Sequence, residues 1–124
     1  MGFVALQYVA MAFDDLELKR IDRQVGALAR QRSPEHVKDQ IRTEYRVKGH
    51  DVVLYSTRPD WLGSDEWMEE PIAKFKFVRS ANEWRLFWMR RDLKWHRYEG
   101  LPASDSLANL VQEVDSDPWC CFFG

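Results

Sequence analysis

The fold of this chain follows from one stretch of sequence, IRTEYRVKGHDVVLY, which runs from Ile41 to Tyr55. In a segment from about Lys38 to Lys48, apolar or uncharged side chains alternate with charged ones, and this period of two predicts a strand with one buried and one wet face. Gly49 then lies in a short polar run typical of a hairpin turn, and a second run of β-forming residues follows. The stretch therefore predicts an antiparallel pair of strands.

A helix is predicted before this pair, over about residues 14–31. Its apolar positions recur at three- and four-residue spacing, and they are Leu18, Ile21, Val25 and Leu28. Asp14 and Glu17 have the spacing of a capping box. Gly26 is unfavourable in the middle of a helix, which indicates a close backbone crossing at that point.

Three more strands are predicted after the hairpin, over residues 71–78, 84–91 and 94–99. The preceding stretch, residues 60–70, carries five acidic residues and no basic one, and it is expected to be a loop. A closing helix is predicted over residues 104–115, capped by Ser104 or Asp105. The expected fold is therefore α+β, an antiparallel meander of four to five strands with an N-terminal and a C-terminal helix.

Length and composition favour one domain over residues 14–124, preceded by an apolar arm at residues 1–13. The chain has 124 residues, of which 45% are hydrophobic and 31% are charged, and it has no apolar run of membrane-spanning length. No basic residue precedes Lys19, so the arm lacks the basic start of a secretory signal. We expect a cytoplasmic protein with no membrane partner, and the arm is a candidate homodimer contact.

Three strings carry a resemblance to a known family: PIAKF at residues 71–75, WRLFWMRRDLKWHRYE at residues 84–99, and DPWCCFFG at residues 117–124. They resemble a small bacterial family defined as a domain of unknown function, over about residues 16–124. The resemblance implies a bacterial, cytoplasmic protein that stands alone. It implies no activity, cofactor or catalytic residue.

Charge is unevenly distributed along the chain. Residues 71–97 carry eight basic and two acidic residues, whereas residues 98–124 carry five acidic and no basic ones. Alternation places Lys74 and Lys76 on one face of their strand, and Arg85 on one face of the next with Phe87. Basic and aromatic side chains are thus expected to interleave on the sheet.

This pattern predicts a binding surface for a protein or nucleic-acid partner, since cations neutralise phosphates and rings stack on bases. The candidate contact residues are Lys74, Lys76, Arg85, Arg90, Arg91, Lys94, Trp95, His96 and Arg97. Phe87, Trp95 and Tyr98 are the candidate stacking rings. Alternatively, the aromatic residues fill the core and the basic groups pair with the acidic loop and tail.

A second alternative is a small hydrolase or nuclease using Asp92 and His96, because a carboxylate beside an imidazole can tune a general base. No recognisable nucleophile motif accompanies them, so we expect a binding module more than an enzyme. Metal-ligand spacings and glycine-rich phosphate loops are absent from the sequence, which predicts no metal site and no cofactor.

Overall fold

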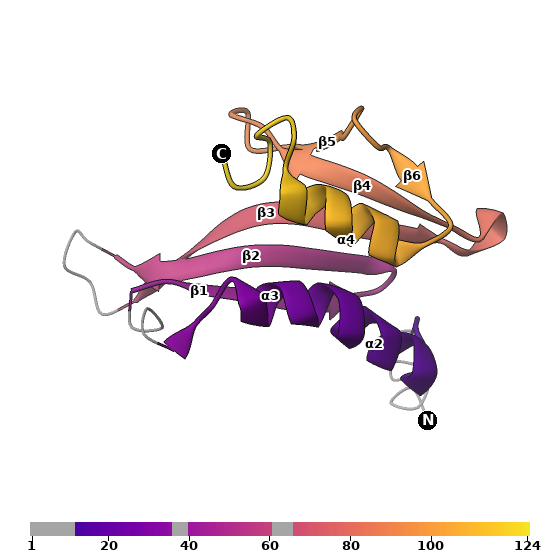
Figure 1. Ribbon diagram of the computed structural model, residues 1–124, viewed down its shortest axis with the longest axis horizontal. Coiled ribbons are helices and arrows are strands. Elements are labelled where there is room, and N and C mark those ends of the chain that lie inside the picture. Colours follow the sequence, from indigo (N-terminus) through magenta and orange to yellow (C-terminus); the bar gives the residue numbers. More distant parts are fainter. Residues whose placement is uncertain (1–11, 36–39, 61–65) are drawn as a thin grey trace, which may run out of the picture.

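The computed structural model describes residues 12–35, 40–60 and 66–124. Within them the chain forms a helical segment, an antiparallel sheet and a second helix, so the predicted α+β class and meander are confirmed (Figure 1). Of the predicted apolar arm only residues 12 and 13 are described. The dimer contact expected from that arm therefore lies outside the described residues.

The first helical segment consists of α2 (Asp15–Ile21), a π-helical turn η1 (Asp22–Gly26) and α3 (Ala27–Gln31). The strands are β1 (Arg42–Lys48), β2 (Asp51–Pro59), β3 (Trp67–Val78), β4 (Glu83–Met89), β5 (Trp95–Arg97) and β6 (Ala103–Ser104). A 3₁₀ turn, η3 (Arg79–Ala81), connects β3 to β4, and α4 (Leu107–Ser116) is the last helix.

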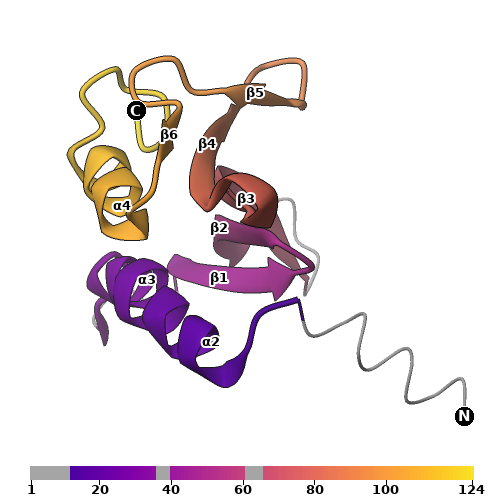
Figure 2. The same ribbon diagram turned by 90° about the vertical axis from the view of Figure 1, so that its right-hand side faces the viewer.

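The strands pair in the order β1-β2-β3-β4-β5, and every neighbouring pair is antiparallel. The short strand β6 also pairs with β4, and it was not predicted because two residues show no periodicity. The two helical segments lie on the same side of the sheet, and no described helix covers the other side (Figure 2). The sheet therefore has one core face and one open face.

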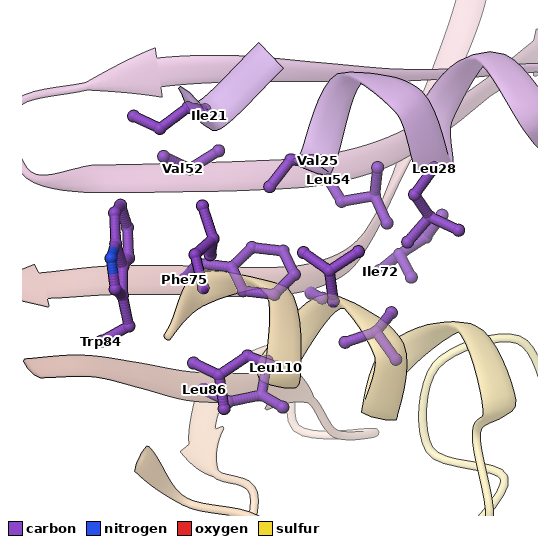
Figure 3. Packing of buried hydrophobic residues seen from close by; sticks show 14 of the residues in the cluster. Ile21, Val25, Leu28, Val52, Leu54, Ile72, Phe75, Trp84, Leu86 and Leu110 are labelled. Atoms are coloured by element: carbon purple, nitrogen blue, oxygen red, sulfur yellow. The ribbon is translucent and has the colours of Figure 1, made fainter. Parts of the chain in front are cut away.

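The core lies between the helices and the sheet (Figure 3). Val25 projects from the helical segment toward Leu54 of β2, while Leu110 of α4 lies over Phe75 and Leu86 of β3 and β4. These five side chains are completely buried. Burying an aliphatic or phenyl side chain stabilises a fold by about 1.5–3 kcal/mol, so this layer holds the strands in register.

The capping box predicted at the start of α2 is confirmed. The amide of Asp14 donates to Glu17 Oε1 at 3.0 Å, and the amide of Glu17 donates to Asp14 Oδ1 at 2.7 Å. The close backbone crossing predicted at Gly26 is wrong, because the side chain of Asp22 occupies that space. A Cβ atom at Gly26 would lie 2.4 Å from Asp22 Oδ1.

The predicted hairpin at Gly49 is confirmed, with Lys48 opposite Asp51 and a φ of +60° at Gly49. The boundary predicted at Pro71 is wrong, because β3 begins at Trp67 and pairs along residues 67–70 with the end of β2. Proline is tolerated at this position because β4 pairs with β3 only from residue 73 onward, which leaves that edge of β3 unpaired at Pro71.

The predicted cap of α4 is also wrong, since the helix begins after Ser106 and no side chain caps it. Beyond α4 the tail is fixed by Asp117, whose carboxylate accepts hydrogen bonds from the amides of Cys121, Phe122 and Phe123 at 2.8, 3.1 and 2.8 Å. Phe122 is buried against Tyr98, with ring centroids 4.9 Å apart. The tail is therefore docked on its own domain.

Candidate functional site

The open face of β3, β4 and β5 brings basic and aromatic side chains into regular rows. Lys74 lies opposite Phe87, and Phe87 lies opposite Arg97, so one row crosses all three strands. In the next rows Lys76 lies opposite Arg85 and Met89 lies opposite Trp95. Alternation within each strand sends the intervening residues to the core face, so the paired side chains share the open face. We call these side chains the open-face cluster: Lys74, Lys76, Arg85, Phe87, Met89, Trp95 and Arg97.

The cations and the rings of the cluster touch one another. Lys74 Nζ lies 4.7 Å from the ring centroid of Phe87 and 5.5 Å from that of Trp95. The Arg97 guanidinium lies 5.7 Å from the ring centroid of Phe87. Phe87 and Trp95 are both half-buried, so part of each ring remains accessible. The cluster is thus a continuous surface of ring and cation.

On the β1–β2 side of the sheet, basic side chains are paired with carboxylates. Arg46 Nη2 lies 2.6 Å from Glu69 Oε2, and Arg58 pairs with Glu70. The Tyr55 hydroxyl donates to Glu44 Oε2 at 3.1 Å. This half of the sheet matches the alternative in which basic residues are neutralised by the acidic stretch around residues 60–70.

In the half of the sheet formed by β3, β4 and β5, most basic side chains of the open-face cluster lack such carboxylate partners among the described residues. Arg85 Nε lies 2.9 Å from Glu83 Oε2, but neither Lys74 nor Lys76 contacts a carboxylate of residues 12–35, 40–60 or 66–124 within ion-pair distance. Arg97 donates to the carbonyl oxygen of Pro102 at 3.3 Å and keeps its charge uncompensated by any described acid. Positive charge is therefore left on this part of the open face.

The nine candidate contact residues fall into three places. Five of them belong to the open-face cluster: Lys74, Lys76, Arg85, Trp95 and Arg97. Arg90 directly follows β4, Arg91 and Lys94 lie in the β4–β5 turn, and all three are exposed. His96 pairs with Trp88 on the opposite, core-side face. The structure thus brings five of the nine together.

One of the predicted stacking rings is wrong. Tyr98 is completely buried, with its hydroxyl donating to Glu113 Oε2 at 2.7 Å, because the alternation of β5 places it on the core side with His96. Met89 was not among the candidate contact residues, although it lies in the cluster opposite Trp95. The alternation of β4 already indicated its face, but its apolar side chain gave no reason to choose it.

Asp92 and His96 contact each other directly across the β4–β5 turn. His96 Nε2 lies 2.8 Å from Asp92 Oδ2, and the Lys94 amide donates to Asp92 Oδ1 at 3.0 Å. The hydrogen bond from His96, followed by that from the Lys94 amide, lowers the pKa of Asp92. Both side chains are partly exposed. The carboxylate therefore fixes the turn and orients the imidazole.

A nucleophile for this pair is not evident among the described side chains. Cys121 lines the same cleft as His96, but burial and the nearby Asp117 raise the pKa of its thiol. A raised pKa keeps the thiol protonated and less reactive. Within the described parts of the chain, no group of three or more His, Cys, Asp or Glu side chains is arranged to hold a metal ion. Likewise, none of the helices described there is long and apolar enough to cross a membrane.

Comparison with known proteins identifies the family of this chain. A family model described as Domain of unknown function (DUF3024) matches residues 13–124. The chain belongs to the DUF3024 family. The family resemblance predicted from the strings at residues 71–75, 84–99 and 117–124 is therefore confirmed, and the match begins slightly before the predicted position. Neither the curated proteins nor the solved structures contain a match to this DUF3024 chain.

Proposed function

We propose that this DUF3024 protein is a binding module whose open-face cluster takes a single strand of nucleic acid. The observation that carries the proposal is the row Lys74, Phe87 and Arg97, in which a ring lies between two cations that no described carboxylate neutralises. Single-stranded nucleic acid is bound by such surfaces, because cations track the phosphates while bases stack on aromatic rings. The bases of a closed duplex are not available for this stacking.

The negative net charge of the chain does not oppose this proposal. Four of the five acidic residues of the segment 98–124 lie just before α4, in α4 or directly after it: Asp105, Glu113, Asp115 and Asp117. Helix α4 covers the core face of the sheet (Figure 2). These carboxylates are therefore separated by the sheet from the open-face cluster, and the local field there is set by the lysines and arginines.

The proposal is tested by a fluorescence-anisotropy titration with a labelled oligothymidylate of about 12 nucleotides at several salt concentrations. Replacing Lys74 by Ala should weaken binding and reduce the slope of log K against log salt by about 0.7, the contribution of one phosphate contact on a single strand. Lys19→Ala is the matched control, because Lys19 is exposed on α2 on the other side of the sheet. If no DNA or RNA strand binds at low salt, the proposal is wrong, and the open face is left as a surface for a protein partner.

The direct contact between Asp92 and His96 favours one second candidate, a hydrolase or nuclease in which His96 acts as a general base. Incubating the protein with single-stranded RNA and DNA and separating the products by length tests it. Cleavage that disappears in His96→Ala supports this candidate. Cleavage that persists in the variant, or no cleavage at all, contradicts it.

A further inference from the structure

A separate cleft lies on the core side of the edge strand β5. It has a volume of about 240 Å³ and is lined by Trp88, Arg90, His96, Arg97, Glu99 and Trp119, together with the thiol of Cys121. Figure 1 shows the C-terminal tail folding back at the same end of the sheet as the β4–β5 turn, and the Trp119 ring contacts Tyr98 at 5.5 Å. The cleft is thus built from three segments: β4, β5 and the tail.

The lining of the cleft combines donors with aromatic walls. Arg90 and Arg97 are planar, permanently charged groups, of the kind that binds phosphate oxygens with two parallel hydrogen bonds. The guanidinium of Arg90 lies 5.5 Å from the ring centroid of Trp88. Among the described residues, Glu99 is the one carboxylate that lines the cleft, beside the two arginines. Trp119 is 58% exposed and supplies an accessible indole at the rim.

The imidazole of His96 is oriented in this cleft by Asp92. Its Nε2 atom is occupied by Asp92, and none of the residues described by the structure bonds to Nδ1. The turn that carries Arg90 is fixed as well, since the Arg90 amide donates to the Lys94 carbonyl at 3.2 Å and the Leu93 amide donates to the Arg90 carbonyl at 2.9 Å. A side chain and a turn that are fixed in this way bind a ligand at low entropic cost.

The cleft and the open-face cluster share one residue, Arg97, which lines the cleft and also lies beside Phe87. Strand β5 is the edge of the main strand order and is only three residues long, with Trp95 and Arg97 on one side and His96 on the other. A nucleic-acid strand that crosses the open face from β3 to β5, as proposed above, would leave the sheet at this edge. Its end would then reach the cleft.

We infer that the cleft beside β5 binds the phosphate and base of a nucleotide at the end of such a strand, held by Arg90, His96 and Arg97 between the Trp88 and Trp119 indoles. The terminal position of the nucleotide rests on the proposed function of the open face. The phosphate and ring chemistry of the cleft does not, because a free nucleoside monophosphate presents the same groups.

The test compares three oligothymidylates of about 12 nucleotides that carry a 5′-phosphate, a 3′-phosphate or hydroxyls at both ends. One phosphorylated end should bind about tenfold more tightly than the hydroxyl form, as expected for one additional charge-assisted contact. Arg90→Ala should abolish this preference while leaving the affinity for the hydroxyl form nearly unchanged. Arg23→Ala is the matched control, because Arg23 is exposed on η1 in the helical layer.

The outcomes separate the inference from the proposed function. If the strands bind with no preference for a phosphorylated end, the terminal site is wrong and the open-face proposal stands. If no strand binds but thymidine monophosphate changes the tryptophan fluorescence, and Arg90→Ala prevents that change, the open-face proposal fails while the cleft takes the free nucleotide. If neither the strands nor the mononucleotide bind, both are wrong.

Discussion

Replacing Gly26 by alanine should not give the stabilisation that this change usually gives in a helix, because the side chain of Asp22 lies in the way. The carboxylate of Asp22 lies over Gly26 and links the helical segment to β1, accepting from the Tyr45 hydroxyl at 2.8 Å and from Arg30 Nη1 at 3.1 Å. The backbone of Gly26 is helical, with φ −63° and ψ −38°, so alanine fits the conformation. A Cβ atom there would lie 2.4 Å from Asp22 Oδ1, so the carboxylate must move.

The size of the effect follows from two opposing contributions. Replacing glycine by alanine inside a helix stabilises it by about 1 kcal/mol. Moving the carboxylate breaks the hydrogen bond from Tyr45, which contributes about 1 kcal/mol to stability. Gly26→Ala should therefore leave the free energy of unfolding nearly unchanged in the natural chain. In an Asp22→Ala background the remaining close atom is Nη1 of the exposed Arg30 at 3.1 Å, which can shift, and the same substitution should stabilise the protein by about 1 kcal/mol.

Urea unfolding of the four proteins in this cycle measures the coupling between the two positions. Tyr45→Phe is the control background: the hydrogen bond is already lost there, so Gly26→Ala should again recover most of its gain. Distant, independent sites add within about 0.3–0.5 kcal/mol. Equal stabilisation by Gly26→Ala in all three backgrounds would refute the reasoning.

Three other predictions concern the fold that supports the open face. Burial, and then the hydrogen bond to Asp22, raises the pKa of Tyr45 to about 12, above its unfolded value of about 10. The stability that this tyrosine contributes is therefore complete below pH ~10 and is lost as the pH rises toward 12. Urea unfolding near pH ~9 and pH ~11 should show a smaller loss of stability in Tyr45→Phe than in the natural chain. Leu86→Ala removes a completely buried side chain from β4 and should cost about 3 kcal/mol, measured as a lower urea midpoint with an unchanged slope. Asp117→Ala removes the acceptor of three tail amides and should cost about 2 kcal/mol, whereas Asp117→Asn, which keeps one acceptor oxygen, should cost less; equal losses in the two variants would contradict this role.

Much of the sheet could be predicted because the alternation of apolar and polar residues along a strand indicates on which face each side chain lies. The pattern from Ala73 to Phe77 predicted that Lys74 and Lys76 share one face of their strand, and the structure confirms it, with Ala73 and Phe75 buried on the other face. The pairing of Lys74 with Phe87 could not be predicted, since the register of β3 against β4 is set by the η3 turn and the left-handed residue Asn82 that follows it. Periodicity within one strand contains no information on the register between two strands.

The errors have similar physical causes. The acidic residues before Pro71 indicated a loop, but their pairing with Arg46 and Arg58 compensates their charge within β3. The contact of Asp92 with His96 depends on a turn in which Leu93 has a φ of +61°. This conformation is rare for leucine and could not be predicted from the sequence of the turn. The predicted exposure of Tyr98 disregarded the alternation of β5, which places Tyr98 on the same side as His96 and opposite to Trp95.

The central claim is that single-stranded nucleic acid binds the open face of β3, β4 and β5. Chemical-shift mapping of the ¹⁵N-labelled protein during titration with an unphosphorylated oligothymidylate tests it most directly. We predict that the largest shifts occur at the amides of Lys74, Phe87 and Arg97 and at the indole N–H of Trp95, while the exposed positions of α2 and α4 remain unchanged. Shifts confined to the helical side, or none at saturating oligonucleotide and low salt, would contradict the claim.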